Sequence, residues 1–586
     1  MEANKQSTTL IKLPEWRLLK CDSNSVSNIK QHFECSEQFA RSLIALGLEN
    51  QEDIKEFLEP DIQSWLMDSP FPSLSEGCKH LQKLVEDDKK ICIHGDFDSD
   101  GIFATLVLSM ALESVGANYV TYIPKRSTGH GLTVKSIEEI KNIEIDALIT
   151  VDCGITAVEE AKILKEKGIE LIITDHHLPD EHLPKALALI NPQLDGDEKF
   201  KILSGAGVAF WLGIELCKHI GENKIRKEAF MRFMQNGLVC AAIATVADVV
   251  PLTGYNRTLV STALKNAHEV DILGLRSLIH ASGFKEKIRA EDLAFQVLPR
   301  LNAAQRMEKE AYIWELLNSK DQGQCESICK SLDELNQSRK ELQKKLFGRF
   351  YHQCLENFEK TGVPEAIIIQ GDDWPEGLSG LIASNLMEKF YRPVFVILFK
   401  DEIGLCSSRA PKGYHIKEVL DKNSELFIGF GGHECAAGFK IHRDKFKELE
   451  NVFQQCFKVQ REVSMDAYEK LVIVSEVNIP MLNDVFLKEL ERLEPFGKEN
   501  EKPYFALRGI LIDGNVKYIG ADKSGVMIKF FKQGQNSIDS IGFSLANRLR
   551  ELDHFGKFDI VFTVGRSPYN QKIQLHLKAI RQHQSR

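Results

Sequence analysis

Between residues 90 and 177 short, mostly apolar runs alternate with amphipathic stretches, and this alternation limits the possible folds more than any other feature of the chain. The apolar runs are ICIH, YVTYIP, DALIT and IELIIT, and the stretches between them, such as TAVEEAKILKEKG, have helical spacing. Strands that are apolar on both faces and alternate with helices of about 10–15 residues are typical of a mostly parallel sheet covered on both sides. The sequence therefore predicts an α/β domain in this region.

The chain of 586 residues is too long for one hydrophobic core, so we expect several domains. Residues 321–360 form a long charged stretch of helical composition. This helix either connects two globular parts or packs along one of them. Strand signals return at EAIIIQ and RPVFVILF, and alternating strands such as LVIVSEV and YFALRGILI follow. The predicted division is a helical lead-in at 1–85, an α/β domain at 86–320, a connector helix at 321–360, a second α/β domain at 361–460 and a small β-barrel at 461–586.

Composition indicates the cellular compartment in which the protein works. The 13 cysteines are scattered with no CxxC pair, which favours a reducing compartment over a disulfide framework. The N-terminus lacks the apolar core of a signal peptide. The longest apolar stretch, GLVCAAIATVADVVPL, is short for a membrane span and is interrupted by Asp248. We expect a cytoplasmic protein with no membrane attachment.

The net charge of −10 conceals an asymmetry along the chain. Residues 501–586 carry 14 Lys and Arg against 7 Asp and Glu, a net charge of +7, so the remainder is strongly acidic. A basic module on an acidic body indicates a polyanionic partner, although an ordinary solvated surface gives the same count.

Acidic and imidazole side chains follow three of the predicted strands. Because the carboxyl ends of parallel strands meet at one edge of a sheet, these side chains are expected to lie together. The residues are His94, Asp98 and Asp100 after ICIH, Asp152 after DALIT, Asp175, His176 and His177 after IELIIT, and Asp248 in the helical stretch ATVADVVPL. One buried Asp is usually structural and one strand His usually belongs to the core, but the recurrence at three strand ends indicates a metal site.

Mixed imidazole and carboxylate ligands suit Mn²⁺ or Mg²⁺. Even six ligands from this group are more than one such ion uses while it keeps positions open for water. We therefore expect two ions that share one carboxylate. Such a pair activates a water and stabilises both oxygens of an in-line displacement at phosphorus.

The segments HGDFDSDG, TVDCG, TDHH and ATVADVVPL resemble motifs I to IV of the DHH phosphoesterase superfamily. Within it the chain is similar to the RecJ family of bacterial single-stranded-DNA-specific 5′→3′ exonucleases, through LPRLNAAQRM, LDELNQSR, GLSGLIASNL, FGGHECAAGF and LEPFGKEN. The likeness covers about residues 90–500 closely and the flanks loosely. It implies a parallel-sheet DHH domain, a second α/β domain of the DHH-associated type joined by the long helix, and a C-terminal OB-like barrel.

The resemblance implies a role for each residue of the cluster. The metal ligands would be His94 and Asp98 for one ion, Asp100, His176 and Asp248 for the other, and Asp152 as the bridge between them. Asp175 and His177 would be catalytic residues that orient His176 or meet the scissile phosphate. Asp96 would be a third such residue or a plain turn aspartate.

Substrate contacts are implied in the second α/β domain and in two loops of the first. Glycines let the backbone approach a phosphate, and Arg offers it a bidentate fork, although a tight turn with an exposed Arg has the same sequence. The candidates are Ser407 and Arg409 in SSRAP, Gly432 and His433 in FGGHECAAG, Arg126 and His130 in KRSTGHGL, and Arg300 in PRLNAA.

The chain departs from the family pattern at three places. A tyrosine is common where His130 stands, a glycine is usual where Gln305 stands, and the sequence around Trp374 differs. These changes affect the expected contacts to the 5′ end of a strand and leave every expected metal ligand in place.

The terminal barrel and its net positive charge suit a groove that follows a phosphate backbone. Aromatic side chains there either stack on bases or fill the barrel core. The candidates are Tyr504, Phe505, Tyr518, Phe530 and Phe531.

The leading hypothesis is a metal-dependent exonuclease that degrades single-stranded DNA from the 5′ end into mononucleotides in DNA repair and recombination, with polarity and substrate implied by the resemblance. It would act as a monomer, supplied by a helicase and a single-strand-binding protein. The alternative is a phosphodiesterase for short oligonucleotides or cyclic dinucleotides, which the additional barrel disfavours. A non-catalytic replication scaffold is disfavoured because the acid and imidazole set is complete.

Overall fold

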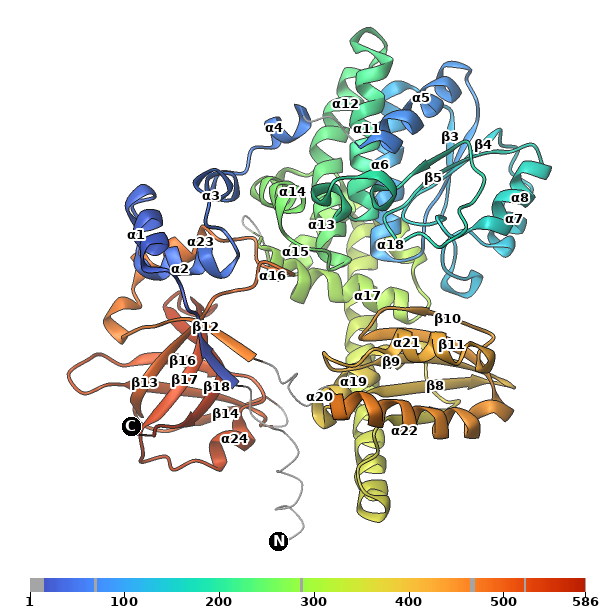
Figure 1. The fold of residues 1–586 in the computed structure, drawn as a ribbon. Coiled ribbons are helices and arrows are strands. Elements are labelled where there is room, and N and C mark those ends of the chain that lie inside the picture. The colour runs from blue at the N-terminus through green and yellow to red at the C-terminus, as the bar shows by residue number, and fades with distance from the viewer. Residues whose placement is uncertain (1–14, 68–70, 285–287, 464–469, 521–522, 585–586) are drawn as a thin grey trace.

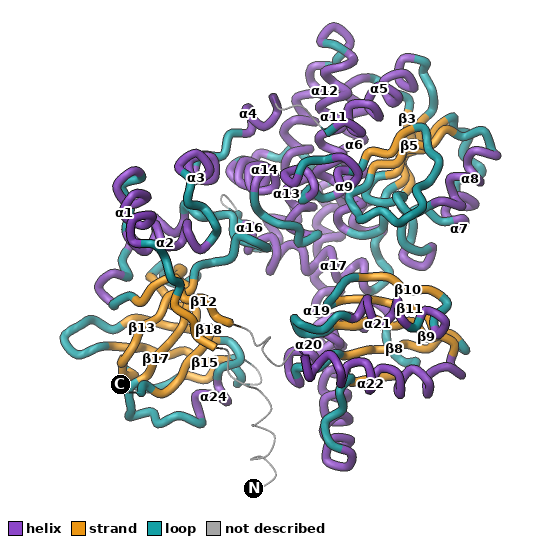
Figure 2. Tube along the Cα trace, in the orientation of Figure 1, coloured by secondary structure: helices purple, strands orange, loops and turns teal. Residues whose placement is uncertain are grey.

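The computed structural model describes residues 15–67, 71–284, 288–463, 470–520 and 523–584. The strands gather in three separate groups, and helices fill most of the remainder (Figure 2). The long helix α19 (Gln322–Thr361) runs past two of these groups, and the third, the barrel, stands beside them (Figure 1). The predicted architecture of two α/β domains, a long helix and a terminal barrel is confirmed.

The first sheet is parallel throughout, in the strand order β3-β2-β4-β5-β6. Its strands are β2 (Ile91–His94), β3 (Tyr119–Tyr122), β4 (Ala147–Thr150), β5 (Glu170–Thr174) and β6 (Ala188–Ile190). The chain passes from β2 to β3 on one side and then crosses to β4 on the other, so β2 lies where the strand order reverses. Ligand sites in open α/β sheets lie beyond the carboxyl ends of the strands at such a point.

Both faces of this sheet are covered, which explains why its strands are continuously apolar. Ile91 and Ile93 of β2 face the core formed with α5, α6 and α11, whereas Cys92 faces α7 and α8. The helices are α5 (Pro72–Glu86), α6 (Ser99–Val115), α7 (Val134–Glu139), α8 (Val158–Glu166) and α11 (Gly205–Ile220).

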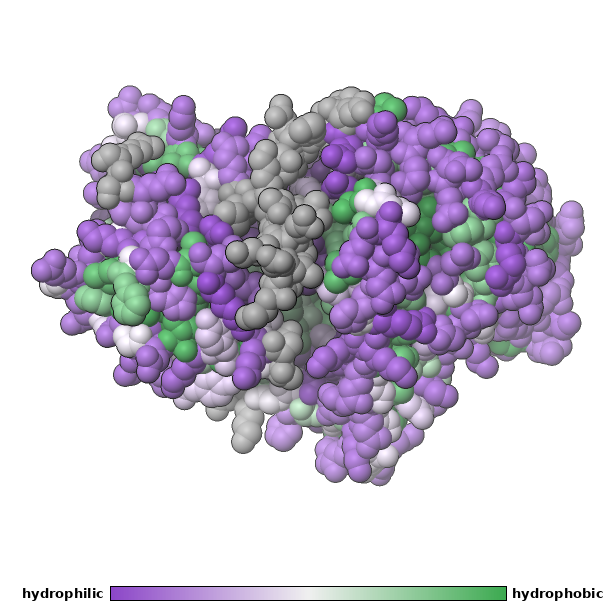
Figure 3. Space-filling view, turned by 90° about the horizontal axis from the view of Figure 1, so that it is seen from below, coloured by the Kyte–Doolittle hydropathy of each residue, from purple (hydrophilic) through white to green (hydrophobic). Residues whose placement is uncertain are grey.

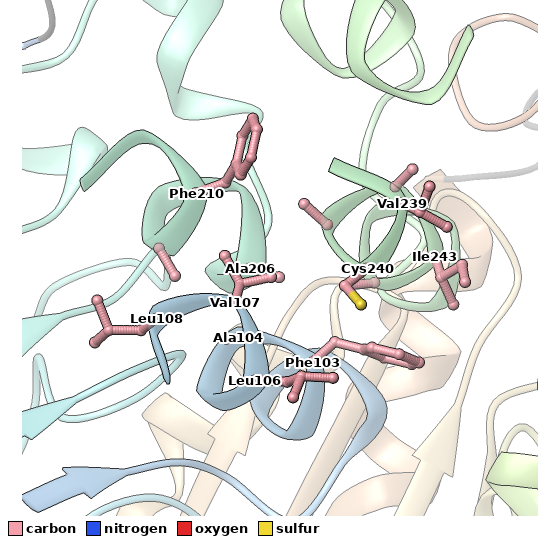
Figure 4. Close-up of a cluster of buried hydrophobic side chains, with 14 of the residues drawn as sticks. Phe103, Ala104, Leu106, Val107, Leu108, Ala206, Phe210, Val239, Cys240 and Ile243 are labelled. Atoms are coloured by element: carbon pink, nitrogen blue, oxygen red, sulfur yellow. The ribbon is translucent and has the colours of Figure 1, made fainter. Parts of the chain in front are cut away.

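The centre of the first domain is the contact between α6, α11 and α13 (Leu238–Ala247). Figure 4 shows their apolar side chains meeting there, among them Phe103 of α6 and Ile243 of α13. Helices α6 and α11 approach closely because α11 carries Gly213, where a Cβ would lie 2.7 Å from the Cβ of Ala111. Since α6 also carries the acidic motif at its N-terminus, this packing holds the motif in place.

Helix α19 both connects the two α/β domains and packs along each of them. Cys325, Ile328 and Leu332 in its first half belong to the core of the first domain. Leu346 and Phe350 in its second half belong to a core of the second domain. The helix therefore does both things that the sequence left open: it connects the two domains and it packs along them.

The second α/β domain has a mixed sheet in the order β10-β11-β9-β8-β7, in which only β7 and β8 are parallel. Its strands are β7 (Ile367–Gly371), β8 (Val394–Lys400), β9 (Ile403–Arg409), β10 (Gly429–Gly432) and β11 (Ala436–His442). Helix α20 (Ser379–Phe390) covers one face with α19, while α21 (Ile416–Lys422) and α22 (Phe446–Val463) cover the other.

The barrel is an eight-stranded sheet in the order β1-β12-β13-β17-β18-β16-β15-β14, closed by an additional pairing of β13 with β15. Its strands are β1 (Glu15–Leu18), β12 (Lys470–Glu476), β13 (Tyr504–Ile512), β14 (Lys517–Ile519), β15 (Gly525–Phe531), β16 (Ile538–Gly542), β17 (Phe558–Arg566) and β18 (Ile573–Gln582).

The N-terminal segment divides between two bodies. Its first part contributes strand β1, which pairs in parallel with β12, so this stretch is not wholly helical. Helices α1 (Ser23–His32), α2 (Glu37–Ala45) and α3 (Gln51–Leu58) share a core with the barrel. Helix α4 (Ile62–Met67), through Trp65, and α5 pack into the first domain instead.

Among the described residues one helical segment, Lys227–Ala247, is long and apolar enough to cross a membrane. Most of it is buried within the first domain, as in a core helix of a globular protein. The face of the molecule seen in Figure 3 is mostly hydrophilic, with apolar residues in small separate patches.

Candidate metal centre and arginine pocket

The ends of three adjacent strands bring the expected metal ligands together. His94 is the last residue of β2, Asp152 follows β4, and Asp175, His176 and His177 follow β5. These strands are neighbours in register, with His94 opposite Thr150 and Thr150 opposite Ile173. The carboxyl edge of the sheet therefore presents imidazoles and carboxylates to one space.

His176 lies at the centre of this group. Its Nε2 atom is 3.1 Å from Asp152 Oδ1, 3.7 Å from Asp248 Oδ2 and 3.8 Å from Asp100 Oδ2. Two sets have ligand atoms close enough together to hold a cation: Asp152, His176 and His177, and Asp100, His176 and Asp248. His176 belongs to both sets and Asp152 to one, whereas His94 and Asp98, for which the resemblance implies a further ion, belong to neither.

Helix ends position the two aspartates of the acidic motif. Asp98 is the N-cap of α6 and accepts a hydrogen bond from Gly101 N at 3.0 Å. Asp100, in the first turn, accepts hydrogen bonds from Gly205 N at 2.7 Å and Ala206 N at 2.8 Å, at the start of α11. Backbone amides of two helix N-termini thus hold these carboxylates in place.

Asp152 adopts an uncommon backbone conformation, with φ of +64°. Only a few per cent of non-glycine residues lie in this region, and Asp is among those that tolerate it. Gly205 makes room for the side chain, because a Cβ there would lie 2.5 Å from Asp152 Oδ1. Such strain, held by its surroundings, is typical of functional sites.

Several buried polar atoms of the cluster have no hydrogen-bond partner in the structure. Both ring nitrogens of His94 are such atoms, and so are Asp152 Oδ1 and His176 Nε2, which lie 3.1 Å apart as an ion-pair contact without forming a hydrogen bond. Buried polar atoms in native proteins are nearly always partnered, so each orphaned atom requires an explanation. A cation held by Asp152 Oδ1 and His176 Nε2 would satisfy both atoms, and a ring nitrogen of His94 is a further possible ligand atom. The residues present therefore fit Mn²⁺ or Mg²⁺.

The carboxylates of the cluster repel one another in the absence of a cation. Burial, with the charge of Asp96, raises the pKa of Asp98 to about 6. Burial, with the charge of Asp100, raises the pKa of Asp248 to about 6. For Asp152, burial and the surrounding aspartates raise the pKa well above its usual value. A bound cation would reverse these shifts by stabilising the charged forms.

Asp175 and His177 form a pair at the edge of the cluster. Asp175 Oδ1 lies 2.7 Å from His177 Nδ1 and accepts a hydrogen bond from His176 N. Burial opposes ionisation of Asp175, but the hydrogen bond and charge of His177 lower the pKa of its carboxyl. The same hydrogen bond raises the pKa of His177 to about 9, so its half-exposed ring is cationic at neutral pH.

Asp96 is directed toward the loop that contains His130. Its Oδ2 lies 3.2 Å from His130 Nδ1, and its Oδ1 accepts a hydrogen bond from Phe97 N at 2.7 Å. Desolvation works against the charged form of His130, but this contact raises the pKa of its imidazole. The buried Asp96 thus anchors an exposed imidazole beside the metal ligands.

Four arginines from separate parts of the chain form a second group, which we call the arginine pocket. Burial, together with the charges of Arg126, Arg339 and Arg409, lowers the pKa of Arg306 to about 10. Arg126 precedes the His130 loop, Arg306 ends α17 (Leu298–Arg306), Arg339 lies on α19 and Arg409 ends β9. A group of arginines at a domain junction is suited to a phosphate group.

The arginine pocket adjoins the metal ligands. The guanidinium of Arg126 lies 5.2 Å from the ring centroid of Phe97, which separates Asp96 from Asp98 in the chain. Its backbone N–H donates to Glu310 Oε1 at 3.0 Å, and its buried Nε has no partner in the structure. Arg306 donates to Gly377 O of the second domain at 2.8 Å. Both α/β domains therefore form the pocket.

Sequence reasoning chose Arg300 and missed Arg306 and Arg339. Arg300 Nε instead donates to Asp333 Oδ1 of α19 at 2.6 Å, and its Nη1 contacts Gln296 O. Both arginines of α17 stand in the same quoted motif, LPRLNAAQRM. The available signal was helical spacing: six residues separate them, which places them on different faces of one helix.

The candidates of the second domain lie at neighbouring strand ends. In register, Ser407 faces Gly438, Arg409 faces Ala436, and Gly432 faces Ala437. Gly432 has φ of +135°, and a Cβ there would lie 2.5 Å from Ala436 O, so only glycine fits. The backbone N–H of His433, in the exposed turn that follows, donates to Ala436 O at 2.8 Å. These residues line the same end of the sheet as the arginine pocket.

The departures from the family pattern have local structural roles. Gln305 is buried, and its Nε2 donates to Ser99 Oγ at 2.9 Å, between the two aspartates at the start of α6. Trp374 is buried, and its Nε1 donates to Ser379 Oγ at 3.0 Å.

Two of the barrel aromatics that we considered for base stacking, Phe505 and Phe530, belong to the barrel core. Tyr518 stands at the edge of that core with the guanidinium of Arg550 4.9 Å from its ring centroid. The strongly exposed aromatics of the barrel are instead Phe543, Phe555 and Tyr569. Strand residues alternate between faces, and the sequence does not show which face closes inward.

Fold and site together define a phosphoesterase of the DHH class, and comparisons with known proteins agree. The family model for the DHH family, N-terminal domain, matches residues 90–243, and the model for the DHHA1 domain matches residues 364–459. The model for the RecJ OB domain matches residues 475–580.

Individual relatives narrow the assignment. The single-stranded-DNA-specific exonuclease RecJ of Haemophilus influenzae is 30% identical over 84% of this chain and 87% of that protein. RecJ of Escherichia coli is 32% identical over 68% of this chain and 71% of that protein. The crystal structure of Thermus thermophilus RecJ with Mn²⁺ superposes with a TM-score of 0.79 at 26% identity, over 97% of this chain and 80% of that one. The chain belongs to the RecJ family.

Proposed function

We propose that the protein is a metal-dependent exonuclease that degrades single-stranded DNA from its 5′ end and releases mononucleotides. The observation that carries the proposal is the arginine pocket beside a cluster of divalent-metal ligands, in a chain whose relatives bear the name single-stranded-DNA-specific exonuclease. The pocket is suited to a terminal phosphate, and the cluster to hydrolysis of the neighbouring phosphodiester.

The six proposed ligands would hold two ions, Mn²⁺ or Mg²⁺. They are His94, Asp98, Asp100, Asp152, His176 and Asp248. When bound, such ions supply Lewis-acid activation of a water and stabilise charge that develops at phosphorus. The Gly205 and Ala206 amides hold Asp100, and the αL backbone holds Asp152, so both carboxylates are positioned before a metal arrives.

His177 contributes a positive charge at the exposed side of the cluster. Its Nδ1 is engaged with Asp175, which leaves the Nε2–H of the cationic ring to donate to a phosphate oxygen. Asp175 keeps the ring oriented and protonated, in the manner of a carboxylate–imidazole pair. We assign Asp175 to positioning and His177 to contact with the scissile phosphate.

On the substrate side, Arg126, Arg306, Arg339 and Arg409 would hold the 5′ phosphate. Ser407, Gly432 and His433 lie on the adjacent strand ends, where backbone and hydroxyl groups can follow the sugar-phosphate chain. His130, anchored by Asp96, closes the side of the site nearest Arg126. Arg300 has no part in this proposal because it is paired with Asp333.

The biological setting is part of the same proposal. Single strands with a free 5′ end arise in DNA repair and recombination, where a helicase and a single-strand-binding protein would supply them. We propose a cytoplasmic monomer, in line with the 13 free cysteines. Light scattering on the purified chain measures the oligomeric state, and a mass near 66 kDa is expected.

The experiment that tests the function uses an 80-nucleotide single strand labelled at either end, with Mn²⁺. We expect the 5′ label to appear at once as a mononucleotide, while the 3′-labelled strand shortens progressively. Asp152→Asn is the control, because Asn tolerates positive φ and removes only the charge. Its rate should fall by at least about 100-fold, since even the outer partners of metal ligands are worth 10- to 100-fold.

The contrary outcome is equally clear. If the wild-type protein leaves the long strand intact but degrades fragments of two to five nucleotides, the protein is a phosphodiesterase for short oligonucleotides. If wild type and Asp152→Asn degrade the long strand at equal rates, the metal cluster is not the active site.

A further inference from the structure

Phe295 is a large apolar side chain that the fold leaves in solvent, with 78% of its surface exposed. It lies in a single π-helical turn, η6 (Leu293–Val297), that continues directly into α17. π-helical turns are rare and often mark functional positions. An exposed phenylalanine at such a turn therefore calls for a function.

Phe295 and Arg306 lie on the same face of one continuous helix. Pro299, Asn302 and Arg306 follow Phe295 by four, seven and eleven residues, the spacing of a helical stripe. These three are partly exposed, whereas the intervening Leu301 is buried. We call this stripe of residues 295, 299, 302 and 306 the α17 strip. At 1.5 Å per residue it is about 16 Å long.

Neighbouring elements cover the α17 strip only in part. Phe295 stands in solvent, whereas Arg306 lies against Gly377 of the second domain, where a Cβ would lie 2.7 Å from the Arg306 Cα. Helix α19 is held against the adjacent face, where Arg300 pairs with Asp333 and contacts Gln296 O. At its far end the strip opens into the arginine pocket, because Arg306 lies among Arg126, Arg339 and Arg409. One end of the strip thus lies in the arginine pocket at the second domain, and the other end carries an exposed aromatic ring.

The strip leads from the arginine pocket toward the barrel. Figure 1 shows α17 above β10, and α16 (Ala290–Asp292), just before Phe295, beside the segment that enters the barrel. Arg289 confirms this proximity, since its guanidinium lies 3.5 Å from carboxylates of Glu491 and Glu494 in that segment. A strand anchored in the pocket and passing to the basic barrel would cross Phe295.

We propose that Phe295 is a base-stacking platform for the single strand whose 5′ phosphate the arginine pocket holds. This rests on the proposed function. Every base has a π face, so stacking on Phe binds any sequence, as a general exonuclease requires. With about 3.4 Å per stacked nucleotide, the 16 Å strip places the platform about five nucleotides from the anchored end.

The test compares Phe295→Ala, Phe295→Trp and a matched control, Met231→Ala. Met231 lies on α12 (Lys227–Arg232) and is 65% exposed, so its substitution removes a similar apolar surface away from the strip. The substrates are 5′-phosphorylated oligothymidylates of 3 and 20 nucleotides. KM and kcat are measured with Mn²⁺, and binding is measured by fluorescence anisotropy in EDTA.

For the 20-mer, Phe295→Ala should raise KM and the dissociation constant by about 5- to 100-fold, the range for one lost base stack, with little change in kcat. The 3-mer should be unaffected because it ends before Phe295. Phe295→Trp should restore binding, and Met231→Ala should behave as wild type. Equal effects on both lengths, or no rescue by Trp, would overturn the proposal.

The experiment distinguishes failure of the Phe295 platform from failure of the exonuclease proposal. If wild type degrades the 20-mer and Phe295→Ala binds it as tightly as wild type, the stacking platform is disproved and the exonuclease proposal stands. If wild type does not degrade the 20-mer but Phe295→Ala binds it more weakly, the exonuclease proposal is disproved and the platform stands.

Discussion

At the scale of single residues, the site depends on charges that the fold alone cannot balance. Buried carboxylates with raised pKa values face orphaned imidazole nitrogens on one side and an arginine pocket on the other. The acidic cluster and the pocket are of opposite sign, adjacent and separately held. This is the arrangement that binding of cations and of a phosphate terminus requires.

The two arginines of α17 provide a matched pair for testing the pocket. We expect Arg306→Ala to raise KM for a 5′-phosphorylated strand by about 10- to 100-fold, the loss that one charge-assisted hydrogen bond to phosphate produces. Arg300→Ala should change KM by less than about threefold, because its partner is Asp333 at the surface. Steady-state kinetics on phosphorylated and hydroxyl-ended strands measures both. Equal losses in the two variants would remove Arg306 from the pocket.

The raised pKa values predict how metal stabilises the protein at different pH. Asp98 and Asp248 have a pKa of about 6 in the folded chain, against about 4 in an unfolded one. Between these values the folded chain binds more protons, so the stability of the metal-free protein falls as pH rises from about 4 to 6. A bound cation favours the ionised forms and offsets this loss.

We therefore expect Mn²⁺ to raise Tm by several degrees more at pH 7.5 than at pH 5.0. Differential scanning fluorimetry with Mn²⁺ or EDTA at matched ionic strength measures this difference. An equal gain at both pH values would show that these carboxylates are not the ligands.

At the scale of elements, one arginine joins the first domain to the barrel side of the molecule. Arg257, on α14 (Gly254–Lys265), is buried and lies 3.5 Å from the ring centroid of Phe57. It donates to Phe57 O at 3.0 Å, Leu493 O at 2.8 Å and Arg492 O at 3.1 Å. Nearby, Leu252 N donates to Lys498 O at 2.9 Å. Helix α14 begins six residues after Asp248, so this junction lies close in the chain to one of the candidate metal ligands.

Arg257→Met should destabilise this junction by about 2–4 kcal/mol, because it leaves three backbone carbonyls, including that of the buried Leu493, without their donor. The first transition in urea unfolding, followed by fluorescence, measures the loss. Arg289→Met is the control, since its ion pairs are partly exposed and 3.5 Å long, and it should change stability by less than about 1 kcal/mol. Equal midpoints for the two variants would contradict the assigned role.

At the scale of the whole molecule, segments far apart in the sequence share one core. Residues 15–58 pack on the barrel, with Phe39, Leu43 and Ile54 in the same core as Phe505. The long helix α19 contributes to the cores of both α/β domains. The two α/β domains and the barrel are therefore joined by contacts between segments that lie far apart in the sequence.

This arrangement predicts the result of truncation. A fragment of residues 1–463 keeps α2 and α3 without the barrel that buries their apolar faces, so it should aggregate. A fragment of residues 59–463 lacks those faces and should remain more soluble. Soluble yield and size-exclusion profiles of the two fragments measure the difference. Similar behaviour of both would show that the N-terminal helices fold independently of the barrel.

Local sequence patterns were sufficient to predict the parallel sheet, the long helix, the barrel and the group of residues at the strand ends. Continuous apolar strands require a doubly covered sheet, and strand direction brings His94, Asp152 and His176 to one edge whatever the rest of the chain does. Local pattern was therefore enough to bring these candidate metal ligands to one edge. The assignment of these residues to two separate ions came from the family resemblance.

Only the tertiary structure decided the arginine pocket, the place of the N-terminal segment and the exposed aromatic side chains. Arg126, Arg306, Arg339 and Arg409 come from four segments, and no local pattern states which of many arginines will meet. Likewise, Phe505 and Phe295 are both phenylalanines with apolar neighbours in the sequence. Phe505 is buried in the barrel core, whereas Phe295 is exposed to solvent. The physical reason is that these features depend on contacts between distant segments, which the packing of the whole chain selects.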